Sequence, residues 1–507
     1  MKSRILRPLL TASILCTLTP AFAGVTAEEA ARLGNDLTPV GAVAAANADG
    51  SVPAWIGDKD FTPELKQLKR ADLERVRATL VGMNLRGVVD KALAAADAGR
   101  FTEVSDLFKG VIEKLPPDLK AIAKTAEKQI ASAALPLVTL TKDNYAQHAD
   151  KLTAGHIEMF KTYPTYKMNI YPGVRNAFYP DEIYQATKAN ATRARLEGTD
   201  GVKHAKLGFP FPIPKHGAEV IWNHKLKFRG TAVRRVNDHA IIKPDGGYKL
   251  TQIVESVKFR YANIKEPPPA NNALMALYLQ EVMAPPRVAG QIILVHETAD
   301  QSTAGRAAWL FSPGLGRVNR APDVGYDNPS IGTDGEQFND QVDTYNGSLD
   351  RYSWKLIGRK EFYIPYNSYV LSMPVLKYKD MLRPGHLNQS LPRYELHRVW
   401  VVEATLKPGV RHQFKKRIFY VDEDSWSIAS VTNYDNRDQI WKVQEAHLVT
   451  APFIPTVTGI PEVIYDLQSK RYFVTSLATE GEIPDWEARF EDTLFNPANL
   501  GRKARTR

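Results

Sequence analysis

The chain has 507 residues, of which 44% are hydrophobic and 24% are charged, and its formal net charge is +10. These proportions are typical of a folded globular protein and exclude an intrinsically disordered or membrane-embedded chain. Charges of both signs are spread along the sequence, so the positive excess does not indicate a nucleic-acid-binding surface.

Residues 1–23 have the three parts of a secretory signal peptide. Three basic residues precede an apolar run over 9–18 and the small-x-small sequence Ala21-Phe22-Ala23. This order predicts export and cleavage after Ala23. A membrane anchor is the alternative, but the apolar run is short for the ~30 Å of hydrocarbon that an anchor spans. Cleavage removes three positive charges and lowers the formal net charge from +10 to +7.

Cys16 is the only cysteine, and it lies inside the predicted signal peptide. Lipidation of Cys16 is disfavoured because Leu15 stands where a lipoprotein signal has a small residue. A mature chain without cysteine can hold neither a disulfide nor a thiol nucleophile nor a cysteine-ligated metal.

Residues 24–60 predict a short helix and then an extended N-terminal segment. Thr26 and Glu29 have the spacing of a capping box, and Gly34 marks the end of the helix. The following stretch is rich in glycine, proline and alanine and cannot form a core alone. We expect it to lie over the main body with Trp55 as its anchor.

Residues 61–135 predict a small all-helical insert. Thr62-Pro63 is a good helix start, apolar residues follow at helical spacing, and Pro116-Pro117 divides the pattern in two. We expect the apolar stripes of these helices to pack against the main body rather than to form a groove for a partner.

Residues 136–480 predict a β-rich domain. Short helices alternate with proline turns up to about residue 200, and "GAEVIWNHKLKFRG" (217–230) indicates a helix followed by a strand. From about 228 onward, strand-like runs are separated by turn sequences such as "SPGLG" and "KPGV", which predicts an antiparallel meander. No βαβ alternation is visible, so a parallel sheet is not expected.

Several of these strands alternate in a way that places bulky apolar groups on one face. In "RVWVVEATL", Trp400, Val402 and Ala404 share one face, and Val401 and Glu403 share the other. A strongly curved sheet with such a face must cover it with helices or enclose an apolar ligand. Core packing is the favoured interpretation for any single residue. The candidates for lining a ligand cavity are Trp309, Phe311, Trp354, Trp400, Phe419, Tyr420, Trp426 and Trp441.

Motifs for catalysis are absent from the sequence: there is no G-x-S-x-G, no Walker loop, no H-E-x-x-H and no dinucleotide fingerprint. His397 and His412 are interpreted as hydrogen-bonded structural residues rather than a metal site. Asp422, Glu423 and Asp424 are interpreted as solvated turn residues rather than an acid–base pair. We therefore predict no catalytic residue, no metal and no cofactor.

Two charged segments remain. Seven acidic residues between 323 and 350 are oxygen ligands of the type that calcium uses, but their spacing favours a long ordered loop, a lid or contact surface, over an ion site. Residues 481–507 form a basic C-terminal tail. For its last stretch, "LGRKARTR" (500–507), a frayed, solvated terminus is favoured over contact with an anionic membrane.

Long stretches of the chain resemble a family of secreted bacterial proteins, domain of unknown function 1329. Among them are "YPTYKMNIYPGVRNAFYPDEIYQATKANATRARL", "FPFPIPKHGAEVIWNHKLKFRG" and "RYELHRVWVVEATLKPGVRHQFKKRIFYVDEDSWSIASVTNYD". The resemblance covers about 24–60 and 140–480. Residues 61–135 depart from the family pattern, in which a shorter proline- and glycine-rich passage stands there.

The resemblance implies a fold similar to that of periplasmic lipoprotein carriers and outer-membrane lipoprotein-sorting proteins. That fold is α+β: a large curved antiparallel sheet, an incomplete β-barrel, wraps around helices and leaves an apolar cavity for acyl chains. The resemblance also implies a Gram-negative periplasmic location, association with the outer membrane, and a resistance–nodulation–division exporter or an outer-membrane protein as partner. It supplies no catalytic residues.

Three classes of function stay open, in decreasing order of preference. The first is a non-enzymatic periplasmic carrier or chaperone that transfers a lipid, lipoprotein or other hydrophobic molecule between the inner and outer membranes. An acyl chain exposed to water costs ~0.8 kcal/mol per CH₂, so such transfer needs a shield. The second is a periplasmic adaptor of an envelope exporter, and the third is an envelope hydrolase.

Overall fold

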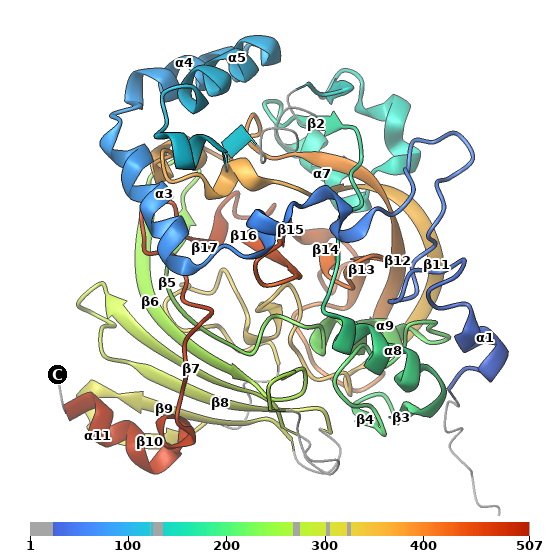
Figure 1. The fold of residues 1–507 in the computed structure, drawn as a ribbon. Coiled ribbons are helices and arrows are strands. Elements are labelled where there is room, and N and C mark those ends of the chain that lie inside the picture. Colours follow the sequence, from blue (N-terminus) through green and yellow to red (C-terminus); the bar gives the residue numbers. More distant parts are fainter. Residues whose placement is uncertain are drawn as a thin grey trace, which may run out of the picture.

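The computed structural model describes residues 24–121, 123–124, 135–266, 274–300, 305–321 and 326–505. The predicted signal peptide and Cys16 lie outside the described residues. The described strands form one large, strongly curved sheet and a separate pair, β3 with β4 (Figure 1). They are β1 (Val138–Leu140), β2 (Met168–Tyr171), β3 (Arg195–Glu197), β4 (Gly201–Lys203), β5 (Ala232–Ile242), β6 (Tyr248–Phe259), β7 (Leu274–Ala284), β8 (Ile292–Thr298), β9 (Ala307–Ser312), β10 (Arg317–Arg320), β11 (Tyr352–Pro365), β12 (Tyr394–Leu406), β13 (Lys416–Asp422), β14 (Ile428–Tyr434), β15 (Ile440–Ala451), β16 (Thr456–Asp466) and β17 (Tyr472–Leu477).

The sheet is built from two antiparallel meanders. Strands β12 to β17 follow one another in space as in sequence, β17 then pairs with β5, and β5 to β10 form the second meander. The path ends at β1 and β10, and β11 pairs with β12, so the sheet does not close into a barrel. The parallel pair of β2 with β12 is the exception to the antiparallel pattern. The predicted fold class, α+β with a large curved antiparallel sheet, is confirmed.

The helical segments lie before the first meander, over the faces of the sheet and in its connections. The α-helices are α1 (Ala27–Ala31), α2 (Pro63–Lys66), α3 (Arg70–Gly82), α4 (Arg86–Asp97), α5 (Phe101–Ile112), α7 (Ala154–Thr162), α8 (Asp181–Arg193), α9 (Gly217–Lys225), α10 (Tyr378–Met381) and α11 (Leu500–Arg505). The 3-10 turns are η1 (Gly57–Asp60), η2 (Tyr145–Lys151), η3 (Pro313–Leu315), η4 (Asn339–Gln341), η5 (Tyr369–Ser372), η6 (Asp492–Phe495) and η7 (Pro497–Asn499).

The two faces of β12 are buried in different hydrophobic clusters, as the alternation in the sequence predicts. Trp400, Val402 and Ala404 belong to a cluster that includes Trp222 of α9, whereas Val399 and Val401 belong to a cluster on the opposite face. Helix α9 contacts β11 and β12, and α7 contacts β14 and β15. In this region, therefore, helices cover the apolar strand surface.

The N-terminal segment lies against the main body. The capping box of Thr26 and Glu29 is present, with the Glu29 N–H donating to Thr26 Oγ1 at 3.1 Å. Trp55 Nε1 donates to the carbonyl of Ala177 at 2.8 Å, and Val52 is completely buried. Trp55 thus anchors the segment as expected.

The C-terminal segment docks on the main body as far as Leu500, which is buried and not solvated. The side chains of residues 503–507, for which a frayed terminus is predicted, lie outside the described part of the chain. Phe495 and Leu500 are buried in a cluster with Leu277, Leu294 and Phe311 of the second meander. Figure 1 shows α11 beside β10 at the lower left. The sequence pattern could not show this docking because its partners lie about 200 residues away. In the described part of the chain, no helix is both long and apolar enough to cross a membrane.

Candidate functional site

An apolar cavity of about 180 Å³, partly open to solvent, lies between the helices α4 and α5 and the main body. The two helices contact each other and are joined by a short turn at Gly99, whose φ of +74° falls in the region that glycine adopts without strain. We call this pair the α4–α5 hairpin. Figure 1 shows it at the upper left, at the margin of the curved sheet.

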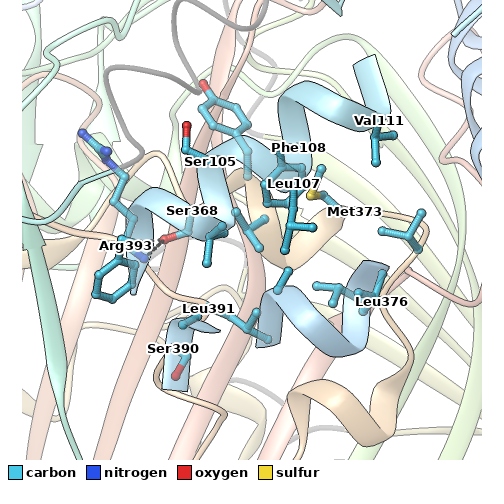
Figure 2. Close-up of a pocket in the computed structure, with 18 of the residues that line it drawn as sticks. Ser105, Leu107, Phe108, Val111, Ser368, Met373, Leu376, Ser390, Leu391 and Arg393 are labelled. Atoms are coloured by element: carbon cyan, nitrogen blue, oxygen red, sulfur yellow. Dashed lines mark hydrogen bonds between the residues drawn. The ribbon is translucent and has the colours of Figure 1, made fainter. Parts of the chain in front are cut away.

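The walls of the cavity are the apolar faces of two segments far apart in the sequence. Val89 and Leu93 of α4 and Leu107 and Phe108 of α5 follow helical spacing and line one side. The other side comes from residues 369–376, after β11, and from Leu391, before β12. Figure 2 shows Leu107 and Phe108 close to Met373 across this space.

Helix α4 is fixed to the main body at both ends. At its start, Arg86 binds Asp380 through two hydrogen bonds of 2.6 and 2.9 Å. Burial raises the pKa of Asp380, but the hydrogen bonds from Arg86, the Lys377 N–H and the charges of Arg86 and Lys379 together outweigh burial and hold that pKa below its usual value. At its end, Asp97 pairs with Arg383 at 2.8 Å and accepts a hydrogen bond from Ser390.

Helix α5 is held differently. Among the described residues, its ion pairs join Arg100 to Glu103 and Lys109 to Asp106 within the helix, and join its C-cap Glu113 to Lys120 and Lys124 of the segment that follows. Its apolar side chains therefore supply the contact with the main body.

One corner of the cavity is polar. Asn367, Ser368 and Arg393 line it, and Figure 2 places Arg393 on the side away from Val111. Ser368 Oγ donates to the backbone carbonyl of Arg393 at 3.1 Å. Arg393 Nε donates to Glu395 Oε1 at 2.6 Å, so a buried carboxylate directly beneath the cavity holds this guanidinium.

Below this corner, His397 is buried between two carboxylates. Its Nε2 lies 3.2 Å from Glu395 Oε2 and its Nδ1 lies 3.2 Å from Asp422 Oδ1. Burial lowers the pKa of His397, but the two carboxylates outweigh burial and raise it to about 9. Burial likewise raises the pKa of Glu395, and Arg393 and His397 bring it down to about 2. At neutral pH this is an ion-paired structural network.

Asp422, Glu423 and Asp424 are buried, so their interpretation as solvated turn residues is wrong. Arg175, only 1% exposed, donates from Nε and Nη2 to the two oxygens of Asp424, each at 2.8 Å. Arg175 Nη2 also donates to Glu423 Oε1 at 3.1 Å. Burial and the neighbouring Asp424 raise the pKa of Glu423 to about 7. The bidentate hydrogen bonds from Arg175, a residue far away in the sequence, explain how the carboxylates of Asp424 and Glu423 tolerate burial.

The turn from Asp422 to Asp424, together with His397, contains a set of atoms that could hold a cation. His397, Asp422 and Asp424 place one donor atom each within 4.8 Å of one another. However, both oxygens of Asp424 accept from Arg175, and Asp422 Oδ2 accepts from Ser425 Oγ at 2.6 Å. A cation there would have to displace a guanidinium from its carboxylate, so the donor set does not fit a metal centre.

The acidic loop between 323 and 350 is ordered over its described part, 326–350, and is bound to basic side chains. Asp340 is buried and pairs with Arg417 and with His412 Nε2, the latter at 3.0 Å. Asp343 pairs with Lys227 at 3.0 Å and with Arg229 at 2.5 Å. Basic side chains of the main body therefore neutralise Asp340 and Asp343.

None of the eight aromatic candidates is among the residues that line the cavity. Trp354, Trp400, Phe419 and Trp426 pack together in the cluster of α9. The other four lie outside that cluster: Trp309 and Phe311 face α11, Tyr420 contacts Phe362, and Trp441 contacts Phe338 and Phe414. These eight aromatic side chains therefore pack against neighbouring strands, helices and loops of the main body. A role for them in ligand contact stays a prediction.

Sequence reasoning missed the residues that do line the cavity. The signal was present in two places: the apolar face of "RFTEVSDLFKGVI" (100–112) and the apolar run "SYVLSMPVL" (368–376). Each was interpretable as ordinary core packing. Only their juxtaposition across more than 250 residues makes a cavity.

The sequence model of one family, described as "Protein of unknown function (DUF1329)", matches residues 139–501. This match does not reach residues 24–60, for which the resemblance to the family stays a prediction. The chain is 40% identical to the "Uncharacterized protein PA3922" of Pseudomonas aeruginosa over 487 residues, which is 95% of this chain and 94% of that protein.

Solved structures show only distant similarity. A DUF1329 family protein from Desulfovibrio piger is 13% identical, with a TM-score of 0.37, and the match covers 54% of this chain and 92% of that one. An outer membrane lipoprotein-sorting protein domain, so described, from Vibrio parahaemolyticus is 14% identical, with a TM-score of 0.39 and coverage of 56% and 98%. The LolA superfamily protein NE2245 from Nitrosomonas europaea is 11% identical, with a TM-score of 0.34 and coverage of 56% and 98%.

Proposed function

The chain belongs to the DUF1329 family, and from its cavity we propose that it is a non-enzymatic carrier or chaperone that shields a hydrophobic molecule or acyl chain. In this proposal the protein acts in the periplasm, between the inner and outer membranes, beside an exporter or an outer-membrane protein. The observation that supports it is the apolar cavity under the α4–α5 hairpin. A carrier needs such a shelter and no nucleophile, metal or redox centre.

The size of the cavity constrains how a ligand would be held. A dry engineered cavity of about 150 Å³ binds benzene, so about 180 Å³ accepts an apolar ring or a short alkyl segment. A longer chain requires the walls to separate. The α4–α5 hairpin is the part that would move, with α4 anchored by ion pairs and α5 held by apolar contacts, so we propose that it acts as the lid.

The direct test is extraction of the mature protein with organic solvent, followed by mass spectrometry and titration with the apolar fluorescent dye N-phenyl-1-naphthylamine. The proposal predicts a co-purified lipid or hydrophobe, and saturable dye binding that a fatty acid or alkyl ligand reverses. An empty protein that takes up neither dye nor lipid would contradict it.

Filling the cavity from the lid should abolish dye binding. Val111 is half-buried on α5 and lines the cavity, so Val111→Trp places an indole ring in the space that the ligand needs. We expect at least about a tenfold loss of affinity, the equivalent of ~1.4 kcal/mol. Asp106→Trp is the matched control, because Asp106 is on the same helix, is 69% exposed and does not line the cavity. Equal affinities of the two variants would place the dye elsewhere.

Releasing the start of α4 should speed ligand exchange. Arg86→Met removes both hydrogen bonds to Asp380, while the Lys377 N–H still donates to that carboxylate at 2.9 Å. The substitution also removes the ion pair of Arg86 with Asp90 on the same helix, which does not reach the main body. We expect dye dissociation, followed by stopped-flow fluorescence, to become about three- to tenfold faster, as for the loss of the partly exposed pair with Asp380. The control is Arg75→Met on α3. Its partner Asp118 lies, like Arg75, within residues 61–135, so this ion pair does not tie the helices to the main body. An unchanged rate in Arg86→Met would argue against α4 as the anchored part of a lid.

A further inference from the structure

One lysine of the cavity lining stands at the opening of the cavity. Of the described residues that line the cavity, Lys109 on α5 alone is exposed; the others are buried or half-buried. Its side chain is 53% exposed. A lysine in such a position covers apolar surface with its alkyl stem and keeps its ammonium group in water. The ammonium group of Lys109 therefore lies where the cavity meets solvent.

A free hydroxyl group lies one helical turn before this lysine. Ser105 lines the cavity and is half-buried. Its Oγ is accessible to solvent and forms no hydrogen bond within the described part of the chain. Residues four apart on a helix are neighbours on one face, with their Cβ atoms about 5–6 Å apart. Ser105 and Lys109 are therefore close enough to donate hydrogen bonds to one small polar group between them.

Ser105 also lies at the more polar end of the cavity. Figure 2 shows Ser105 on the same side as Ser390 and Arg393, and places Val111 and Leu376 on the opposite side. An alkyl chain in the cavity thus has apolar walls at one end and the flank of α5 that carries Ser105 at the other.

The accessible charge at this end favours an anion. The ammonium group of Lys109 lies 3.7 Å from Asp106, and both side chains are more than half exposed, so water screens this pair. Asp106 does not line the cavity. Within the described lining, the carboxylate is that of Asp60, which is half-buried and accepts from Asn176 Nδ2 at 3.3 Å. Lys109 is therefore the most exposed charge of the lining.

We propose that Ser105 and Lys109 bind the head group of the ligand, and that the ligand is a single-chain amphiphile with an anionic head of the carboxylate or phosphate type. The oxygens of such a head accept from the Ser105 hydroxyl and from the Lys109 ammonium group, while the chain lies under the α4–α5 hairpin. The inference rests on the proposed function, because the apolar cavity has to hold the chain.

The test is displacement of N-phenyl-1-naphthylamine from the full mature protein by decanoate, decyl phosphate, decan-1-ol and decyltrimethylammonium at pH 7.5 and low salt. The four compounds share one alkyl chain and differ in the head. We expect both anions to bind about three- to fivefold more tightly than the alcohol, the range for a partly exposed charge pair, and the cation to bind most weakly. High salt should reduce the advantage of the anions. The anion that binds more tightly identifies the head as carboxylate or phosphate.

Two substitutions on α5 test the residues. Lys109→Gln should reduce the affinity for the anions to that for the alcohol and leave the alcohol unaffected. Lys114→Gln is the matched control, because Lys114 is also exposed and follows α5 but does not line the cavity. Ser105→Ala should weaken the anions by about two- to threefold, the worth of one hydrogen bond. This effect should shrink in the Lys109→Gln background, because two residues that hold one group are coupled.

The outcomes separate this inference from the proposed function. Equal binding of the anions and the alcohol by the wild-type protein would overturn the head-group site and leave the carrier proposal intact. Tighter binding of the cation would assign recognition to Asp60 and would overturn the choice of an anion. Equal effects of Lys109→Gln and Lys114→Gln would reduce the role of Lys109 to general surface charge, against the proposal. Failure of all four compounds to displace the dye, or failure of the dye to bind, would overturn both.

Discussion

Replacing Arg175 by methionine is expected to lower the free energy of unfolding by about 3–5 kcal/mol, as for loss of one partner of a buried ion pair. The substitution leaves Asp424 buried without its bidentate partner and Glu423 without one of its donors. It also weakens the attachment of the N-terminal segment, because Arg175 donates to the carbonyls of Val43 at 2.8 Å and Pro53 at 3.0 Å. Urea unfolding followed by tryptophan fluorescence measures the first effect, and limited proteolysis between residues 24 and 60 measures the second.

Arg32→Met is the matched control for this prediction. Arg32 also forms an ion pair, with Asp36 at 2.6 Å, but the pair is 50% and 58% exposed. Water and salt screen such a pair, so the urea midpoint should not move measurably. If Arg175→Met behaved like Arg32→Met, the corner from Asp422 to Asp424 would be more hydrated than its burial indicates.

The contribution of His397 to stability should disappear as the pH rises. Its pKa is raised in the folded protein to about 9, from an ordinary value of 6.5, so the folded state holds the proton more tightly than the unfolded state. The contribution is complete below pH 6.5 and is lost as the pH rises through 9. The shift corresponds to a free energy on the order of 3 kcal/mol.

The measurement is the difference between the wild-type protein and His397→Gln in urea unfolding at several pH values from 6 to 9.5. Lys225 and Lys227, whose pKa values burial lowers to about 8, change stability in the opposite direction over part of this range. Their effect is common to both proteins and cancels in the difference. We expect the wild-type advantage to be largest near pH 6 and to vanish above pH 9; a constant difference would mean that His397 is not charged in the folded state.

Local chemistry in the sequence was sufficient for most of the secondary structure and for the class of fold. The period-two pattern around Trp400 placed alternate residues on opposite faces of β12, because side chains of a strand must alternate. The capping box at Thr26 followed from residue types that satisfy exposed backbone groups at a helix start. Helix α9 followed from the pattern of apolar residues in 217–230. The meanders followed because turn-forming sequences separate strands that pair with their sequence neighbours.

What local patterns in the sequence determined is therefore the order of the elements, the faces of the strands and the antiparallel meanders, which depend on residues close together in the chain. The curved, incomplete barrel followed from the family resemblance, and it requires β17 to pair with β5 across more than 200 residues. Only the tertiary structure decided where the cavity is and which charges are buried. Arg175 meets Asp424 across 249 residues, and α5 meets the segment after β11 across an even longer stretch. The energy of burying a charge or an apolar face depends on the partner that arrives there, and no local pattern specifies that partner.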